Sequence, residues 1–184
     1  QIDYEKCISC GACVYHCPFG ATVDVSGIVD VINSLKESRI DRNNPTVAIV
    51  APSIASQFLY ANLGQVITGI KRLGFATVFE VALGADMVAS KEAQELVEKG
   101  FLTSSCCPAF VKYIETKFPK LTDKISHNLS PMAELGKFLK EGHPEYKIVF
   151  IGPCIAKKAE IRKTEVGKYI DYAITFEELQ ALFD

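Results

Sequence analysis

The chain has 184 residues, 48% of them hydrophobic, which is enough for one buried core with a small additional segment. Its formal net charge is −2, which argues against nucleic acid or an anionic membrane surface as a partner. No apolar stretch approaches the ~20 residues that span a bilayer, and no charged leader precedes an apolar segment. We therefore expect a cytoplasmic protein with no membrane partner.

Residues 1–27 are rich in cysteine and glycine and too short to form a core. The run CISCGACVYHCP at residues 7–18 has the C-x2-C-x2-C-x3-C-P spacing of bacterial ferredoxins. Zinc sites usually use two separated C-x2-C pairs. We therefore interpret this segment as a ferredoxin-like [4Fe–4S] site rather than a zinc site, with four candidate ligands: Cys7, Cys10, Cys13 and Cys17.

The fourth cysteine of the run leaves an alternative open. In two-cluster ferredoxins this cysteine binds the other cluster, and the chain contains a single such run. Cys17 therefore either completes a local cluster or serves a second one. We favour the second alternative, with residues 1–27 as one half of a two-cluster domain, and we expect His16 to be structural.

Residues 28–45 are interpreted as a linker, because an apolar segment, Ile28–Leu35, leads into a polar bridge from Lys36 to Pro45. From residue 46 onward, apolar segments of strand and helix length alternate. The predicted strands are 46–50, 77–81, 101–104, 147–152 and 172–175. The predicted helices are 53–73 with a break at Gly64, 85–99, 108–118, 131–140 and 176–183. This alternation predicts an α/β domain over residues 46–184, with a mainly parallel sheet flanked by helices.

Three further cysteines follow predicted strands of this domain. Ligands gather beyond the carboxyl ends of parallel strands, so Cys106, Cys107 and Cys154 predict one shared site. Pro108 keeps Cys107 extended, and a helix start next to Lys157 favours a thiolate at Cys154. The alternative on spacing alone is that these cysteines are inert core thiols.

Two motifs around these cysteines resemble the signature segments of the [FeFe]-hydrogenases. SSCCPAF at 104–110 resembles T-S-C-C-P-G-W, and GPCIAKKAE at 152–160 resembles M-P-C-x-x-K-K-x-E. APSIA at 51–55 resembles A-P-[SA]-V-R of the same family. The resemblance covers nearly the whole chain in the right order. It implies an H-cluster, a [4Fe–4S] cube joined to a diiron unit with CO and CN ligands, which forms or oxidises H2.

The resemblance also implies roles for single residues. Cys107 and Cys154 match two of the four thiolates that hold the cube, and Cys106 matches the cysteine that passes protons to the diiron unit. Lys157 matches the lysine that pairs with one cyanide. Pro52 and Ser53 match pocket residues near the other cyanide.

A proton path is implied as well. Glu92, Glu95 and Lys99 lie at i, i+3 and i+7 of a predicted helix, a pattern that by itself is typical of a solvated face. In the family, protons move through two glutamates and a serine to the cysteine, which would be Glu95, Glu92, Ser126 and Cys106 here. An arginine is usual at the position of Lys99. We expect His127 and His143 to be structural or exposed.

The chain departs from the family pattern in two ways. Gly152 replaces a methionine, Ala109-Phe110 replace Gly-Trp, and Met132 stands where glutamine is common, which predicts a roomier pocket and a divergent or sensory member. The third signature, E-x-M-A-C-x-x-G-C-x-x-G-G-G, which supplies the other two cube ligands, does not occur in the 184 residues. We therefore expect the chain alone to be inactive and to need the remainder of the hydrogenase.

The leading hypothesis is part of an [FeFe]-hydrogenase that receives electrons from ferredoxin or another iron-sulfur domain. The alternative is a hydrogenase-like iron-sulfur protein without the diiron unit, with a role in iron-sulfur assembly or electron transfer. Cys106 and Lys157 favour the enzyme, because a protein without diiron chemistry needs neither. A plain electron carrier would leave Cys106, Cys107 and Cys154 unexplained.

Overall fold

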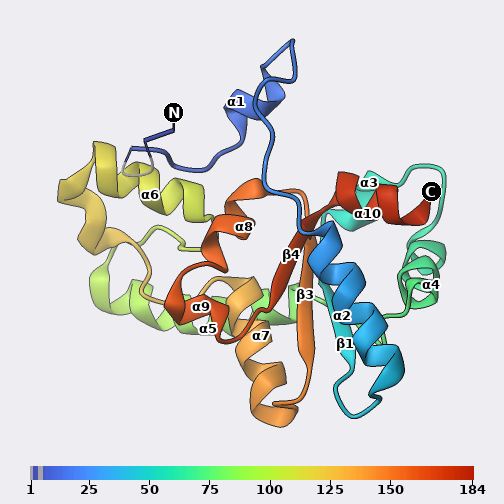
Figure 1. Cartoon of the computed structure of the whole chain (residues 1–184). Helices are drawn as coiled ribbons and strands as arrows, with labels where there is room; N and C mark the ends of the chain where they lie inside the picture. The colour runs from blue at the N-terminus through green and yellow to red at the C-terminus, as the bar shows by residue number, and fades with distance from the viewer. Residues whose placement is uncertain (1, 4–5) are drawn as a thin grey trace.

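The computed structural model describes residues 2–3 and 6–184 (Figure 1). Within these residues, four strands form one sheet in the order β2-β1-β3-β4, and every neighbouring pair is parallel. The strands are β1 (Thr46–Val50), β2 (Val78–Glu80), β3 (Lys147–Gly152) and β4 (Tyr172–Thr175). The predicted α/β class with a parallel sheet is therefore confirmed.

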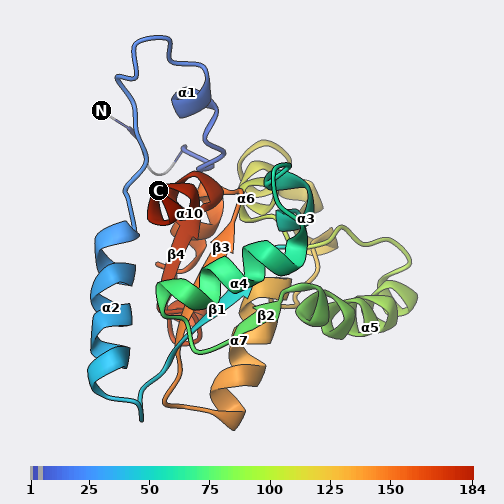
Figure 2. The same ribbon diagram turned by 90° about the vertical axis from the view of Figure 1, so that its right-hand side faces the viewer.

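The helices cover both faces of this sheet, and Figure 2 shows α2 and α7 on opposite sides of the strands. None of the helices in the described residues is long and apolar enough to cross a membrane. The α-helices are α1 (Ala12–Tyr15), α2 (Ile28–Ile40), α3 (Ile54–Gln57), α4 (Leu63–Leu73), α5 (Ala82–Lys99), α6 (Pro108–Lys117), α7 (Pro131–Gly142), α8 (Ile155–Glu160), α9 (Thr164–Gly167) and α10 (Phe176–Phe183). A short 3-10 helix, η1 (Pro119–Lys124), follows α6.

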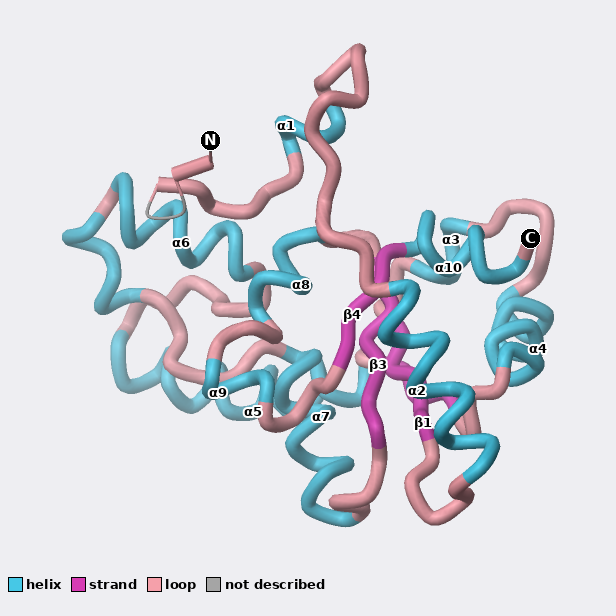
Figure 3. Tube along the Cα trace, viewed as in Figure 1, coloured by secondary structure: helices cyan, strands magenta, loops and turns pink. Residues whose placement is uncertain are grey.

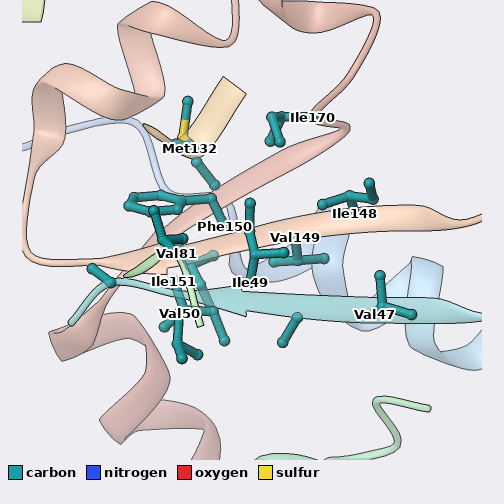
Figure 4. Close-up of a cluster of buried hydrophobic side chains, with 14 of the residues drawn as sticks. Val47, Ile49, Val50, Val81, Met132, Ile148, Val149, Phe150, Ile151 and Ile170 are labelled. Atoms are coloured by element: carbon teal, nitrogen blue, oxygen red, sulfur yellow. The ribbon is translucent and has the colours of Figure 1, made fainter. Parts of the chain in front are cut away.

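The central strands form the middle of the hydrophobic core. All five residues of β1 are buried, as are the last five of β3, because helices lie over both faces of the sheet. Figure 4 shows Met132 of α7 and Ile170 on the same side of the sheet as the ring of Phe150. This packing fixes the ends of β1 and β3, from which two segments of the candidate site begin.

Helix α2 corrects the interpretation of residues 28–45 as a linker. The chain is helical as far as Ile40, so the first half of the expected polar bridge, residues 36–40, is not a loop. Val31 and Leu35 are buried in the core of the sheet domain, and the hydroxyls of Ser34 and Thr46 share a hydrogen bond of 2.8 Å. The exposed polar face of the helix has the composition of a loop, which explains the wrong expectation.

The predicted third strand, 101–104, is also wrong. Thr103 forms a single parallel bridge with Ile125 and does not join the sheet. Gly100 ends α5 in a left-handed conformation, and the hydroxyls of Ser104 and Ser105 bond to other segments. These side-chain hydrogen bonds hold the segment in place of a strand ladder.

The predicted helix over 53–73 is divided in two, but not at Gly64. The break lies between α3 and α4, and Gly64 is in the first turn of α4. Asn62 and Gln65 form a capping box, in which each side chain accepts a hydrogen bond from the other residue's backbone N–H. This cap fixes where α4 begins, while the predicted helix 176–183 and the strands at 147–152 and 172–175 have the observed bounds.

The contact between α5 and α7 yields a test of the fold. A Cβ atom at Gly84 of α5 would collide with the carbonyl oxygen of Pro131, so we expect Gly84→Ala to lower the free energy of unfolding by about 1–3 kcal/mol. Gly142 of α7 has open space around it, and Gly142→Ala is the matched control, with no loss expected. Urea unfolding measures both values, and equal stabilities of the two variants would contradict this packing.

Candidate metal centre

One cavity of about 300 Å³ lies beyond the ends of β1 and β3. All six residues that the resemblance assigns to cofactor binding or to proton transfer beside it line this cavity: Pro52, Ser53, Cys106, Cys107, Cys154 and Lys157. The rest of the lining is mainly apolar and includes Val81, Met132 and Phe150. The structure therefore brings these six residues together, although they come from three distant parts of the sequence.

Cys107 and Cys154 occupy equivalent positions at the starts of two helices. Cys107 is the N-cap of α6 and Cys154 is the N-cap of α8, and both have an extended backbone. Pro108 is the first residue of α6, as expected from its fixed φ angle. Each of the two thiols therefore stands next to the first turn of a helix, where backbone N–H groups have no partner within the helix.

The prediction that all three cysteines follow strands of the sheet is only partly confirmed. Cys154 follows β3 directly, whereas Cys106 and Cys107 follow a segment that is not a strand of the sheet. Cys106 is exposed, and Cys107 is partly buried. The two adjacent cysteines both line the cavity, so they differ in exposure and not in which site they reach.

Lys157 is fixed in the cavity wall by two acceptors. Its Nζ atom donates to the carboxylate of Glu160 at 2.6 Å and to the backbone carbonyl of Cys106 at 2.9 Å. The side chains of Lys157 and Glu160 are 12% and 7% exposed. This ion pair ties α8 to the segment that carries Cys106. Sequence reasoning did not select Glu160, although its i+3 spacing from Lys157 on a helix was a usable signal.

The two predicted proton-path glutamates each bond to a serine, and only one of these serines, Ser126, was predicted. The Ser104 hydroxyl donates to Glu92 at 2.9 Å and accepts the backbone N–H of Cys106 at 3.3 Å. Separately, the Ser126 hydroxyl donates to Glu95 at 3.0 Å. Ser104 was missed by sequence reasoning, because a serine two residues before a cysteine has no distinctive spacing.

Glu95 is surrounded by hydrogen-bond donors. Lys99 Nζ lies 2.7 Å from one carboxylate oxygen, and the side-chain amide of Asn128 donates to the other at 2.9 Å. The hydrogen bond from Lys99, with further ones from the His127 backbone and Ser126, outweighs burial and lowers the pKa of Glu95 to about 2. Glu95 is therefore ionised at neutral pH, and it holds the 126–128 loop against α5.

The N-terminal cysteine run surrounds a second cavity, of about 430 Å³. Cys7, Cys10 and Cys13 line it, together with residues of α8. The loop turns through two left-handed residues, Ser9 with φ of 58° and Gly11 with φ of 80°. The backbone N–H of Ser9 donates to the sulfur of Cys7 at 3.4 Å. Such N–H···S bonds stabilise thiolates around iron-sulfur clusters.

Cys17 lies apart from that cavity, whose lining it does not join. Its sulfur accepts the backbone N–H of Ala21 at 3.3 Å. Hydrogen bonds from the N–H groups of Phe19 and Ala21 lower the pKa of the Cys17 thiol. These hydrogen bonds favour the anionic form of Cys17, which does not line the cavity of the other three cysteines.

The donor set fits a cluster better than a single metal ion. Among the residues that the structure describes, no three His, Cys, Asp or Glu side chains are grouped so that they could hold one ion. A zinc ion needs ligands that converge on one point, whereas each thiolate of an iron-sulfur cube binds a different iron atom. Cysteine spacing and N–H···S contacts therefore fit a [4Fe–4S] cluster.

The surroundings of Gly152 are more crowded than the roomier pocket that we expected from the sequence. A Cβ atom at Gly152 would lie 3.2 Å from the Cβ of Ala51 and closer still to the ring of Phe150. The ring of Phe150, which lines the cavity, thus takes the space next to Gly152. The aromatic ring two residues earlier on β3 therefore occupies the space that a side chain at position 152 would need.

Comparison with known families decides the relationship. The family described as "Iron only hydrogenase large subunit, C-terminal domain" matches residues 44–184, and the family described as "4Fe-4S binding domain" matches residues 1–22. The chain belongs to the iron-only hydrogenase large-subunit family. This relationship confirms the resemblance that its motifs indicated.

Individual relatives agree with this assignment. The chain is 31% identical, over 96% of its length, to the NADP-reducing hydrogenase subunit HndD of Solidesulfovibrio fructosivorans, and 34% identical, over 63%, to iron hydrogenase 1 of Clostridium pasteurianum. It is 25% identical, over its whole length, to the cytosolic Fe-S cluster assembly factor NAR1 of Meyerozyma guilliermondii. It spans 35%, 23% and 39% of these three relatives, respectively.

The four donors around Glu95 predict a pH-dependent contribution to stability. Glu95→Gln should lower the free energy of unfolding at pH 7 by about 2 kcal/mol, because Lys99 loses a charged acceptor. The folded-state pKa is about 2 and the ordinary value is 4.5, so the stabilisation is complete above pH 4.5 and is lost as the pH falls toward 2. Urea unfolding from pH 7 to 2 measures the difference, and a constant difference would contradict this role.

The ring of Phe150 predicts how this hydrogenase-family chain responds to a methionine at position 152, the residue in the M-P-C motif that this segment resembles. Gly152→Met should lower the free energy of unfolding by about 1–3 kcal/mol, because the new side chain meets the ring. In the Phe150→Ala background, Gly152→Met should lower the free energy of unfolding by a smaller amount, since the ring no longer fills the space next to position 152. A double-mutant cycle by thermal or urea unfolding decides this, and strictly additive losses would disprove the contact with the ring.

Proposed function

We propose that this chain is the part of an iron-only hydrogenase that receives electrons and supplies protons to an H-cluster. The observation that carries this proposal is the single cavity lined by Cys106, Cys107, Cys154 and Lys157. Cys107 and Cys154 would hold two corners of the cube. Two more thiolate ligands have to come from outside these 184 residues.

When bound, the H-cluster would supply the redox chemistry that forms or oxidises H2. The chain's own residues would prepare the surroundings. Lys157, fixed by Glu160, presents an ammonium group to the cavity, where it can pair with an anionic ligand of the cofactor. The mainly apolar lining would lower the local dielectric and so strengthen that interaction.

Proton supply would end at the thiol of Cys106. Ser104 connects the carboxylate of Glu92 to the backbone of Cys106, so Glu92 forms the inner end of the path. Glu95 and Ser126 form the outer end, where Lys99 holds the carboxylate ionised. A proton carrier works best with a pKa near the operating pH, and the pKa of Glu95 is about 2, so Glu95 would provide fixed charge.

Electrons would arrive through the cluster held by Cys7, Cys10 and Cys13. Ferredoxin or another iron-sulfur domain is the proposed donor, because the chain's N-terminal part matches a 4Fe-4S binding domain. Cys17, which lies apart from the other three, is proposed to serve a second cluster. None of the seven cysteines forms a disulfide, which supports a reducing compartment such as the cytoplasm.

One observation favours a second candidate function. The chain is similar over its whole length to a protein named as a cytosolic Fe-S cluster assembly factor. In a hydrogenase-like protein of that kind, the cubes would be bound without a diiron unit. Cys106 and Lys157 would then have no cofactor to serve, yet both line the cavity, which favours the hydrogenase.

The adjacent cysteines supply the test. In the longer hydrogenase polypeptide that contains this chain, Cys107→Ser should remove the cube, with a loss of about four iron atoms per chain. Cys106→Ser should keep the iron and lower H2 turnover by about 100-fold or more, as expected for loss of a proton donor. Iron analysis and H2 evolution measure the two effects.

Each cysteine variant serves as the control for the other. Loss of iron in Cys106→Ser would show that Cys106 is a ligand, and full iron in Cys107→Ser would refute its role as one. Two variants that keep all iron and full turnover would exclude a cluster at this cavity. A wild-type polypeptide that binds iron at this cavity and evolves no H2 would support the assembly-factor alternative.

A further inference from the structure

Lys158, the neighbour of Lys157, points to a different part of the molecule. Successive residues of a helix are about 100° apart around its axis, so the two ammonium groups leave α8 in different directions. Lys158 Nζ pairs with Asp24 and lies 2.6 Å from the carboxylate of Glu178. It also donates to the backbone carbonyl of Val25 at 3.1 Å. Its side chain is 9% exposed.

The partners of Lys158 come from two separate segments. Asp24 and Val25 belong to the stretch between α1 and α2, which contains no helix or strand (Figure 3). Glu178 belongs to α10, where it also accepts the backbone N–H of Gly27 at 2.9 Å. The buried cation thus joins α8, α10 and the segment that follows the cysteine run.

Without regular structure, this segment depends on a few side-chain contacts for its position. The hydroxyl of Thr22 holds it to the carbonyl of Cys13 at 3.0 Å, which ties it to the cysteine loop. Lys158 then ties Asp24 and Val25 to α8. Removing the cation would leave two buried or half-buried carboxylates facing each other, a costly arrangement.

The same helix faces both cavities. Cys154, at the start of α8, lines the H-cluster cavity, and Lys158 lines the cavity of Cys7, Cys10 and Cys13. A third space, of about 760 Å³, lies between the two sites and is lined by both Cys10 and Cys154. Cys10 of the first site and Cys154 of the second therefore border one common space.

We propose that Lys158 is a positioning residue that fixes the cysteine-rich segment on α8, so that Cys10 and Cys154 keep bordering one common cavity. This inference rests on the proposed function for its consequence, which is efficient electron transfer between the two clusters. The anchoring itself depends only on the contacts of Lys158 with Asp24, Val25 and Glu178.

Amide hydrogen exchange tests the anchoring directly. Lys158→Met keeps most of the aliphatic stem and removes the charge, and we expect exchange in residues 20–27 to become about tenfold faster. Lys158→Arg should restore exchange close to that of the wild type. Lys36→Met, an exposed change on α2, is the matched control and should have no effect. Unchanged exchange in Lys158→Met would overturn the proposal.

Asp24→Asn keeps the test decisive if Lys158→Met does not fold. It removes only the carboxylate on the segment and leaves the contact between Lys158 and Glu178. The exchange rate of residues 20–27 should rise, but by less than in Lys158→Met, and the exchange rate of α10 should not change. If Asp24→Asn exchanges like the wild type, Lys158 serves the core alone and the anchoring role is wrong.

The consequence for electron transfer needs a second readout. In the longer hydrogenase polypeptide, Lys158→Met should keep its iron, and H2 evolution driven by reduced ferredoxin should fall severalfold more than evolution driven by reduced methyl viologen, a small dye. Equal losses with both donors would overturn the positioning role. A wild type that evolves no H2 with either donor would refute the proposed function, while the exchange comparison would still decide the anchoring.

Discussion

The ammonium group of Lys157 is the contact on which the candidate site depends. It is shared between Glu160 on its own helix and the backbone carbonyl of Cys106, 51 residues away in sequence. This bond holds the start of α8 next to the segment before α6, and so brings Cys154 and Cys107 to one cavity. A buried ammonium with two acceptors is stable here because neither charge is left unpaired.

The parallel sheet also brings parts of the candidate site together. β1 and β3 are neighbouring parallel strands, so their carboxyl ends lie at the same edge, where Ala51-Pro52-Ser53 and Pro153-Cys154 follow. Phe150 closes the space beside Gly152, and α8 extends from Cys154 toward the N-terminal cysteines. One short helix thereby relates the proposed H-cluster cavity to the proposed electron-transfer cluster.

Much of this arrangement could be predicted from the sequence because it depends on patterns among residues that are close together in the chain. The apolar runs at 46–50 and 147–152 are buried strands, and the cysteine spacing at 7–17 is a local property of the chain. The roles of Cys106, Cys107 and Cys154 came from motif resemblance, and their shared cavity agrees with that grouping. Residues 101–104 have the composition of a strand but do not join the sheet. Ser104 bonds to Glu92 instead, and the adjacent Ser105 bonds to the backbone carbonyl of Asn128.

Long-range ion pairs were the least predictable feature. Helix α2 looked like a linker because only Val31, Ser34 and Leu35 on it are buried, and that burial depends on the sheet beneath. The partners of Lys158 lie 134 and 20 residues away, and no spacing rule connects them. Periodicity detects faces of single elements, whereas such contacts depend on how complete elements pack.

Iron-edge anomalous diffraction from crystals of the longer polypeptide, purified without oxygen, tests the central claim most directly. We expect two separate iron groups within this part of the protein. One should lie among Cys7, Cys10 and Cys13, and the other should contact Cys107 and Cys154, with the Lys157 ammonium beside it. Iron among the N-terminal cysteines alone, with Cys107 and Cys154 unligated, would contradict it.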